Sequence, residues 1–481
     1  MNVRFILHVL GTLLAAEGIL MLLPAAVSLM YGEGDAVSIL AAALTTLATG
    51  ASFRFFFKSG SREIGKREGH VIVSAVWIVF TVFGSLPFIF SGQIPSVSDA
   101  FFETMSGFTT TGSTILTDIE RLSHGMLFWR SLMHFTGGLG ILVMAIAILP
   151  VFGVGSMSIY QAETSSAIAG NRLSPKIKDT ARHITRIYLF FNVACMLFYL
   201  PEMGVFDALC HAFSTTASGG FSTKNASMGT YSAYSQYVSV AFMLLAGTNF
   251  TLLFYAWKRD FRKLTSNDEF RYYLSIVLVA SLFICCWLLF DGAGTERSVR
   301  ESLFHTVSIL TTTGYVVSDY TLWTPPLWFV LYLISFVGGC AGSTSGGLKV
   351  VRFVLLSRAI PVQFKRILHQ RGMIQVKLNG QNVSDDQLFR TLSFFMIFLC
   401  IFTVGALVLM ICGLDFVSAV GAAIACLSNS GPGLGMVGPA GSFAEISAVG
   451  KWVCSFMMLL GRLELYAVLI LCSRNFWKSE G

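Results

Sequence analysis

Four runs of glycine and hydroxyl residues interrupt an otherwise apolar chain, and they constrain its fold more than any other feature. The central glycines lie 108, 94 and 117 residues apart, and they are Gly112, Gly220, Gly314 and Gly431. Thirteen residues before each glycine stands a residue type that favours a helix N-terminus as a cap or a charge, namely Asp99, Asp207, Glu301 and Ser418. About ten moderately apolar residues lie between, which is less than half the length needed to cross a ~30 Å hydrocarbon core. The shared offset predicts four copies of one unit.

Long apolar segments surround these runs. The 481-residue chain is 54% hydrophobic and 12% charged, whereas a soluble domain is typically about 25% charged. Segments close to the ~20 residues of a spanning helix recur from end to end. We expect ten spans, at residues 5–30, 36–57, 71–91, 125–152, 184–201, 236–257, 272–290, 326–356, 390–412 and 447–472.

The charges predict how the chain is oriented. The connections 54–70, 153–186, 258–271 and 349–390, together with the two chain ends, hold 26 of the 33 Lys and Arg residues. By the positive-inside rule both termini are expected to be cytoplasmic. The opposite connections carry 14 acidic residues, which would draw cations toward an entrance there. The net charge of +7 therefore belongs to the inner face, and no basic patch interleaved with aromatics favours a nucleic-acid partner.

The predicted fold is an all-α polytopic membrane protein with four channel-like units. Each predicted unit consists of a spanning helix, a short re-entrant helix, an extended strand of small polar residues and a second spanning helix. An extra pair of helices precedes the first unit. The expected boundaries are 1–70 for the N-terminal pair and 71–170, 171–271, 272–388 and 389–481 for the four units.

A polar, extended backbone at membrane depth must line water or be buried in protein. Four such strands can surround one axis, with the negative C-terminal ends of the four short helices directed at a shared cavity that favours a cation. Glycine lets backbone carbonyls turn inward and replace an ion's hydration shell. The alternative for any single run is close helix packing by small residues.

The four runs carry a family resemblance. They read GFTTTGST at 107–114, TTASGGFST at 215–223, LTTTGYVVSD at 310–319 and LSNSGPGLG at 427–435. The chain resembles, over essentially its whole length, the TrkH/TrkG/KtrB superfamily of potassium transporters, and the bacterial TrkH type most. That resemblance implies one pore built from four degenerate units, in which backbone carbonyls bind the transported potassium. The carbonyls concerned would be those of Thr111, Gly112, Gly219, Gly220, Thr313, Gly314, Ser430 and Gly431.

Two details qualify this resemblance. Some plant relatives that pass sodium carry serine in place of the first glycine, so Gly112 implies a preference for potassium. The fourth run, with Pro432 after Gly431, departs most from a Thr-Gly pattern.

The segment 335–352 interrupts a helix that would otherwise cross the membrane. Its five glycines make a continuous helix costly, at about 1 kcal/mol each relative to alanine. The spacing of a nucleotide-binding P-loop is not met around Lys349. The resemblance implies an intramembrane loop at 338–349 that blocks the permeation path, with a packing break as the alternative. The expected gate residues are Gly342, Gly346, Gly347, Lys349 and Arg462.

Three basic residues lie in apolar segments. Arg462 is deep in the last one, where an arginine usually faces a cavity or a partner. We expect its charge to hold back cations near the pore, or to pair with a carboxylate such as Glu17. TrkH relatives resemble this chain in having a basic residue in the last helix near the pore. Arg130 and Lys451 lie near helix ends and are expected to extend their charged groups to the membrane surface.

The expected function is potassium uptake across the bacterial inner membrane, not catalysis. The resemblance implies a homodimer, contacts with membrane lipid and a cytosolic TrkA-type ring that binds nucleotides and docks on the basic inner loops. No tightly bound cofactor is expected besides the transported potassium ions. The alternative is a secondary transporter of another cation or small solute, although such proteins often show inverted repeats. The sequence leaves open whether transport is coupled to protons or sodium.

Overall fold

The computed structural model describes residues 2–57, 66–148, 177–369 and 374–478, and these are mostly helical. The N-terminal helices are α1 (Val3–Leu20), α2 (Leu22–Met30) and α3 (Ala36–Phe56). Helices α1 and α3 approach closely because glycines face each other's backbones. A methyl group added at Gly50 would lie 2.5 Å from the backbone nitrogen of Ala15. This is the small-residue packing that membrane helices use.

Four units follow, each with a short helix between longer ones. The first holds α4 (Lys66–Gly84), α5 (Leu86–Phe90), α6 (Val97–Phe108) and α7 (His124–Ile148). The second holds α10 (Ile177–Tyr199), α11 (Val205–Thr216), α12 (Ala233–Ala246), α13 (Phe250–Trp257) and α14 (Phe261–Thr265). The third holds α15 (Asp268–Phe290), α16 (Thr295–Leu310), α17 (Pro325–Ser335), α18 (Val350–Leu368) and the strands β1 (Val376–Leu378) and β2 (Gln381–Val383). The fourth holds α19 (Asp385–Ile411), α20 (Phe416–Ser428), α21 (Ala448–Arg462), α22 (Tyr466–Leu469) and α23 (Arg474–Trp477).

The predicted unit boundaries fall close to the helices that open the units. Residues 71, 272 and 389 each lie a few residues inside α4, α15 and α19, because those helices begin earlier, with polar first turns. The boundary at residues 170 and 171, and most of the basic connection 153–186, lie outside the described residues.

Five helical segments are long and apolar enough to cross a membrane, among the residues that the structure describes. They are Val3–Met30, Ala36–Phe56, Arg67–Phe90, Asp268–Phe290 and Asp385–Ile411. Two further predicted spans are bent pairs, with 103° between α12 and α13 and 109° between α21 and α22. The helices α7 and α10, with 25 and 23 residues, cover residues 125–148 and 184–199 of the predicted segments 125–152 and 184–201, and residues 149–152 lie outside the described residues. The predicted span 326–356 is divided into α17 and α18 by the glycine-rich segment.

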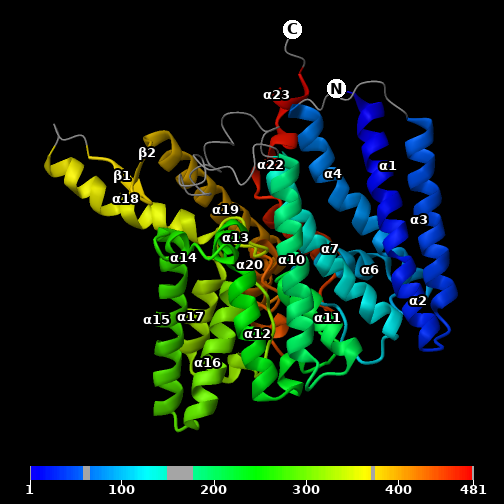
Figure 1. Cartoon of the computed structure of the whole chain (residues 1–481), viewed down its shortest axis with the longest axis horizontal. Helices are drawn as coiled ribbons and strands as arrows, with labels where there is room; N and C mark the ends of the chain where they lie inside the picture. The colour runs from blue at the N-terminus through cyan, green and yellow to red at the C-terminus, as the bar shows by residue number, and fades with distance from the viewer. Residues whose placement is uncertain (1, 58–65, 149–176, 370–373, 479–481) are drawn as a thin grey trace.

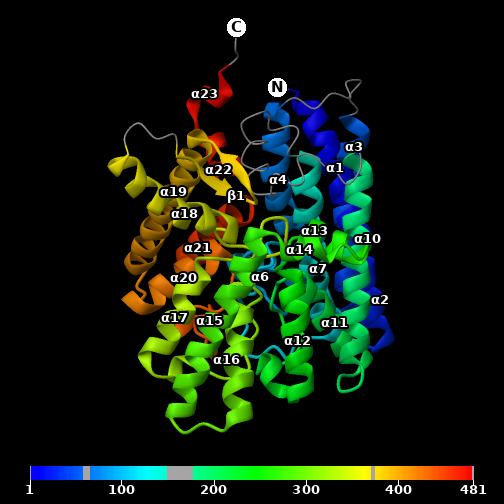
Figure 2. The same ribbon diagram turned by 60° about the vertical axis from the view of Figure 1, so that its left-hand side comes forward.

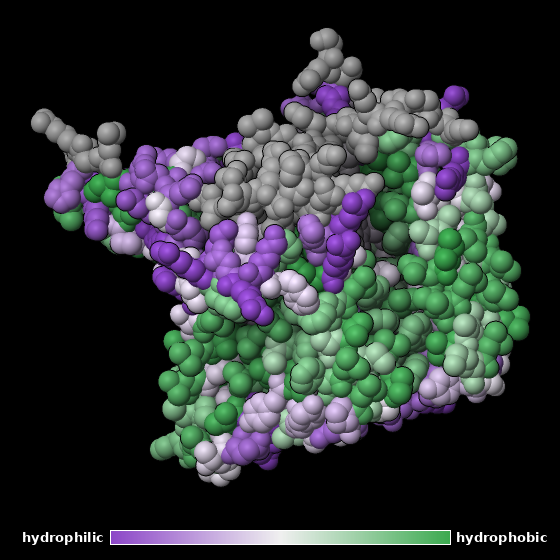
Figure 3. Space-filling model, in the orientation of Figure 1, coloured by the Kyte–Doolittle hydropathy of each residue, from purple (hydrophilic) through white to green (hydrophobic). Residues whose placement is uncertain are grey.

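The surface matches a protein that crosses a bilayer. A broad apolar belt covers the helical body between two polar faces (Figure 3). The first turn of α1 and helix α23 lie at the same face of the body (Figure 1). On that side α18 and the β1–β2 hairpin project past the spanning helices, held by Arg358, which donates to Asp268 and to the Lys377 carbonyl at 2.7 Å each.

The four short helices α6, α11, α16 and α20 lie among the spanning helices (Figure 2). They are 12, 12, 16 and 13 residues long, so α16 is clearly longer than the predicted ten or so residues and the other three are slightly longer. Most of their residues are buried. Two separate apolar clusters support them, one joining α6, α7, α20 and α21 and the other joining α10, α11, α12, α16 and α17.

None of the four predicted residues is the cap itself, but Asp99 and Asp207 lie in the first turns of α6 and α11, where they supply the predicted negative charge at the positive helix end. The capping positions are Ser96, Gly204, Gly294 and Asp415. Three of the residues expected as caps are instead the third helical residue, and Glu301 is further in because α16 begins a turn earlier, in a polar segment. Hydrogen bonds from the Ser418 side chain and backbone hold the pKa of Asp415 below its usual range, which keeps a negative charge at the start of α20.

Candidate functional site: a ring of four loops

The loops that follow α6, α11, α16 and α20 meet in a closed ring. A methyl group added at Gly112 would lie 2.2 Å from the carbonyl oxygen of Gly219, in the next loop. The same contact recurs at 2.0, 2.5 and 2.9 Å around the ring, with Gly220 against Thr313, Gly314 against Ser430 and Gly431 against Thr111. These eight residues, all predicted as site residues, are called the four-loop ring below. The structure brings all of them together.

The backbone of each loop alternates in handedness. The four central glycines have φ between +79° and +87°. Two residues before each of them, a second residue is also left-handed, with φ between +51° and +55°, namely Thr110, Ser218, Thr312 and Asn429. Alternating hand turns successive peptide groups toward the same side. Glycine is therefore required at the four central positions for two reasons. The positive φ disfavours other residues, and the neighbouring carbonyl leaves no room for a Cβ.

The residue before each glycine has its N–H occupied. In all four units this N–H donates to the carbonyl of the residue five positions earlier in the short helix. The distances are 2.9, 2.8, 2.9 and 3.0 Å for Thr111, Gly219, Thr313 and Ser430. Each bond fixes the loop on the C-terminal end of its helix. The carbonyls of the same residues are left to face the central glycine of the preceding loop.

A cavity of about 410 Å³ opens on one side of the ring. All four central glycines line it, together with residues of the connections expected on the outer side, including Lys224, Asn225 and Glu445. Arg130 also borders this cavity.

On the other side of the ring, the loop 338–349 contacts the second, third and fourth units directly. Thr344 donates to the carbonyls of Thr216 and Ala246 at 3.1 and 3.2 Å. The N–H of Gly346 donates to the Thr312 hydroxyl at 2.7 Å, and a methyl group at Gly346 would lie 2.3 Å from the Ser428 carbonyl. The loop therefore lies against the C-terminal ends of α11, α16 and α20, and an arginine links it to the first unit.

The predicted gate residues have distinct places in this loop. Gly342 and Gly347 are left-handed, with φ of +71° and +74°, and so is Lys349, at +72°. Gly347 packs on Gly338, since an added methyl group would lie 2.7 Å from the Gly338 Cα. The Lys349 ammonium group donates to the Ser345 carbonyl inside the same loop. Their conformation and close contacts explain why no regular helix forms here.

Arg462 ends α21 and is 2% exposed. It donates to the Thr344 carbonyl at 2.8 Å and to the Gly137 carbonyl of α7 at 3.4 Å. The alternative pairing with Glu17 is wrong, because the Glu17 carboxylate oxygens have no hydrogen-bond partner among the described residues. Arg462 thus places a positive charge, bonded only to carbonyl oxygens in the described part of the chain, beside the loop 338–349.

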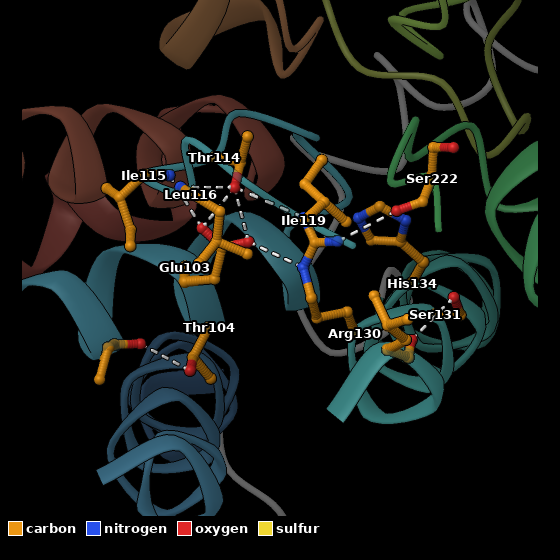
Figure 4. A network of polar contacts seen from close by, with 12 residues as sticks. Glu103, Thr104, Thr114, Ile115, Leu116, Ile119, Arg130, Ser131, His134 and Ser222 are labelled. Atoms are coloured by element: carbon orange, nitrogen blue, oxygen red, sulfur yellow. Dashed lines mark hydrogen bonds and ion pairs between the residues drawn. The ribbon is translucent and has the colours of Figure 1, made fainter. Parts of the chain in front are cut away.

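The expected surface positions of Arg130 and Lys451 are also wrong. The Arg130 side chain is 1% exposed, and its Nε lies 2.9 Å from Oε1 of Glu103 (Figure 4). The Lys451 ammonium group lies 2.6 Å from Oδ1 of Asp99 and is 7% exposed. Each cation has an acidic partner in α6, so it has no reason to extend to the membrane surface.

Sequence reasoning missed two features of the site. The first feature is the left-handed residue two positions before each central glycine. Because this offset is the same in all four loops, the sequence repeat could have predicted these residues. The bond between Arg462 and Thr344 had no such signal, because these residues are 118 positions apart.

Comparisons with known proteins show the family and agree with the overall fold. Residues 36–479 match the model of the TrkH family, described as cation transport protein. The chain is 38% identical over 497 residues to the Trk system potassium uptake protein TrkH of Vibrio parahaemolyticus, covering 100% of both chains. It is 35% identical to TrkH of Escherichia coli, over 99% of this chain and 100% of the relative. The crystal structure of the potassium transporter TrkH from Vibrio parahaemolyticus superposes with a TM-score of 0.91 at 37% identity, covering 99% and 100% of the two chains.

The ring geometry predicts a specific loss of stability. Replacing Gly220 with alanine places a methyl group 2.0 Å from the Thr313 carbonyl, at a φ of +83°. Gly292 has almost the same φ, +85°, with nothing within 4 Å of the added methyl group. Both variants carry the backbone strain of about 1–2 kcal/mol, but only Gly220→Ala adds a clash, at about 1–3 kcal/mol. Thermal unfolding in detergent should therefore show a lower melting temperature for Gly220→Ala than for Gly292→Ala. Equal melting temperatures would show that the ring contact is not rigid.

Proposed function

Because the chain belongs to the TrkH family of cation transport proteins, we propose that it takes up potassium across a bacterial inner membrane through the four-loop ring. The observation that carries the proposal is the closed series of carbonyl-to-glycine contacts from Gly112 round to Gly431. The relatives in Vibrio parahaemolyticus and Escherichia coli are named potassium uptake proteins. The family model is described as a cation transport protein, so the proposed role is transport and not catalysis.

The ring supplies what a dehydrated cation needs. Carbonyl oxygens replace the water around the ion, and four short helices direct their negative C-terminal ends toward it. The expected ion ligands are the carbonyls of the eight ring residues. The cavity of about 410 Å³ gives hydrated ions access from the outer side.

The loop 338–349 is proposed as the gate. It lies against the C-terminal ends of α11, α16 and α20, on the side of the ring opposite the cavity. The hydroxyl bonds of Thr344 and the glycine contacts of the loop hold it there. Movement of Gly342, Gly346, Gly347 and Lys349 would open the path while the ring keeps its shape.

Arg462 contributes to this barrier in two ways. Its guanidinium group fixes the loop through the Thr344 carbonyl at 2.8 Å. Its charge also repels a passing cation: at an effective dielectric of about 20, a unit charge about 6 Å away costs roughly 3 kcal/mol.

We further propose both termini on the cytoplasmic side, a homodimer in the membrane, and a cytosolic nucleotide-binding ring of the TrkA type as regulator. The basic connections and the face that carries α18 and the β1–β2 hairpin are the proposed docking area. The projection of α18 and the hairpin beyond the spanning helices supports this (Figure 1).

Uptake by proteoliposomes tests the transported class. Purified protein should accumulate radioactive rubidium, a potassium substitute, along a potassium gradient, and should not accumulate amino acids or sugars. Solute uptake without rubidium uptake would instead support a secondary transporter.

The identity of the ring as a selectivity filter is tested at Gly112. Gly112→Ser should lower potassium-over-sodium discrimination, because the added Cβ lies 2.2 Å from the Gly219 carbonyl and shifts it. The measurement is the reversal potential under bi-ionic potassium and sodium conditions. Gly292→Ser, at the same φ in open space, is the control and should keep the wild-type reversal potential. A wild-type value in Gly112→Ser would remove Gly112 from the filter.

The gate is tested by releasing the loop. Arg462→Ala and deletion of residues 343–345 should each raise ion flux by about tenfold or more, since each 1.4 kcal/mol removed from a barrier gives a factor of ten. The reversal potential should not change, because ring and gate are separate elements. Thr344→Val is the milder variant, which keeps the chain length while it removes the hydroxyl bonds.

The measurement for these variants is single-channel current and open probability at equal protein density. Arg358→Ala, a change on the same side that touches neither loop nor ring, should conduct like the wild type. Effects of Arg462→Ala and Thr344→Val should not add, because the two residues share a contact. If every gate variant conducts like the wild type, the barrier lies elsewhere.

A further inference from the structure

The residue nine positions before each central glycine differs among the four units. These residues are Glu103, His211, His305 and Ala422. We propose that Glu103 and its partner Arg130 are positioning residues that fix the first two loops relative to each other and thereby set the preference for potassium over sodium. This rests on the proposed function of the ring.

Glu103 binds the first loop with both carboxylate oxygens. The Thr114 hydroxyl lies 3.0 and 2.9 Å from Oε1 and Oε2, and the N–H of Ile115 donates to Oε2 at 3.0 Å. The Glu103 side chain is fully buried behind the loop (Figure 4). The carboxylate therefore fixes the strand just past Gly112 on the side away from the ring.

Arg130 extends this contact to the second loop. Its Nε donates to Glu103 at 2.9 Å, while its NH1 group donates to the Ser222 carbonyl at 3.2 Å (Figure 4). The guanidinium carbon also lies 3.9 Å above the ring of Phe221. Phe221 and Ser222 directly follow Gly220. The ion pair therefore spans the joint at which Gly112 faces the Gly219 carbonyl.

The residues at the same position in the other three units make different contacts. His211 contacts the Ser222 hydroxyl at 2.9 Å and His305 contacts the Ser318 hydroxyl at 3.2 Å, each within its own unit. Ala422 has no polar side chain, and the adjacent Gly421 packs directly on the Leu434 backbone. His211 also lies against Tyr315 of the third unit, but among these four positions only Glu103 forms an ion pair, and its partner Arg130 bonds to a second loop. The ion pair of Glu103 and Arg130 therefore links one pair of neighbouring loops in the ring and not all four pairs.

The pair also controls charge at the outer cavity. Arg130 borders that cavity, and the Glu103 carboxylate neutralises the positive charge of Arg130. Removing only the carboxylate charge leaves a buried positive charge, which repels cations that enter the cavity. Removing both charges restores neutrality but leaves the two loops without their link. Flux and selectivity should therefore respond differently to single and double variants.

The test compares three variants in bi-ionic potassium and sodium recordings with purified full-length protein at equal density. Glu103→Gln should lower the potassium-to-sodium permeability ratio by at least about threefold and should lower potassium flux. The double variant Glu103→Gln/Arg130→Met should recover flux but not the permeability ratio. Glu202→Gln is the control, because this carboxylate also holds two serine hydroxyls on an outer connection, those of Ser232 and Ser235, yet lies away from the ring.

A folded Glu103→Gln protein with the wild-type permeability ratio overturns the inference. If that variant cannot be purified folded, Thr114→Val serves in its place, since it removes the hydroxyl at Glu103 and leaves the ion pair intact. It should lower the ratio in the same direction, and an unchanged ratio overturns the inference equally. A wild-type protein that does not discriminate potassium from sodium refutes the proposed function instead.

Discussion

Backbone polar groups inside a bilayer must find partners within the protein or line water, and the rest of this structure depends on how that requirement is met. In each loop the N–H before the central glycine bonds back to the short helix, so its carbonyl remains available. The carbonyls then have neighbours that only glycine allows, since any Cβ at Gly112 or Gly220 would overlap them. The short helices, the apolar clusters behind them and the spanning helices all serve to hold these four strands together.

The same requirement explains the broken helices on the side of the ring opposite the cavity. The segment between α17 and α18 has non-helical peptide groups at membrane depth, and several of them bond at the break between α12 and α13. The N–H groups of Cys340 and Thr344 donate to the carbonyls of Gly247 and Ala246, and the N–H of Phe250 donates to the Gly342 carbonyl. Arg462 satisfies one more carbonyl, that of Thr344, from a helix that itself bends by 109° just afterwards. A continuous helix at either place would use its peptide groups in its own hydrogen bonds. It would leave none to bond to residues next to the ring.

Most of the architecture follows from the repeated offset and from the length of the apolar segments, because both are direct consequences of bilayer thickness and helix geometry. The eight ring residues were predicted from that offset, and the structure brings them together. The capping positions of the short helices were not predicted, because two of the four are glycines without a capping side chain. The burial of Arg130 and Lys451 depends on acids 27 and 352 residues away, and no local pattern marks such pairs.

The joint between the last unit and the first has a consequence for how the chain is made. Gly431 faces Thr111 across 320 residues of sequence, and this joint is sealed by contacts from the fourth unit. The Ser113 hydroxyl donates to the Gly431 carbonyl and the N–H of Phe443 donates to the Thr114 carbonyl, each at 2.9 Å. Synthesis from the N-terminus delivers the first three loops to the bilayer before these partners exist. Until the final unit is inserted, the nascent protein carries an open arc of polar backbone, so ring closure comes last and a truncated chain exposes the defect that membrane quality control can detect.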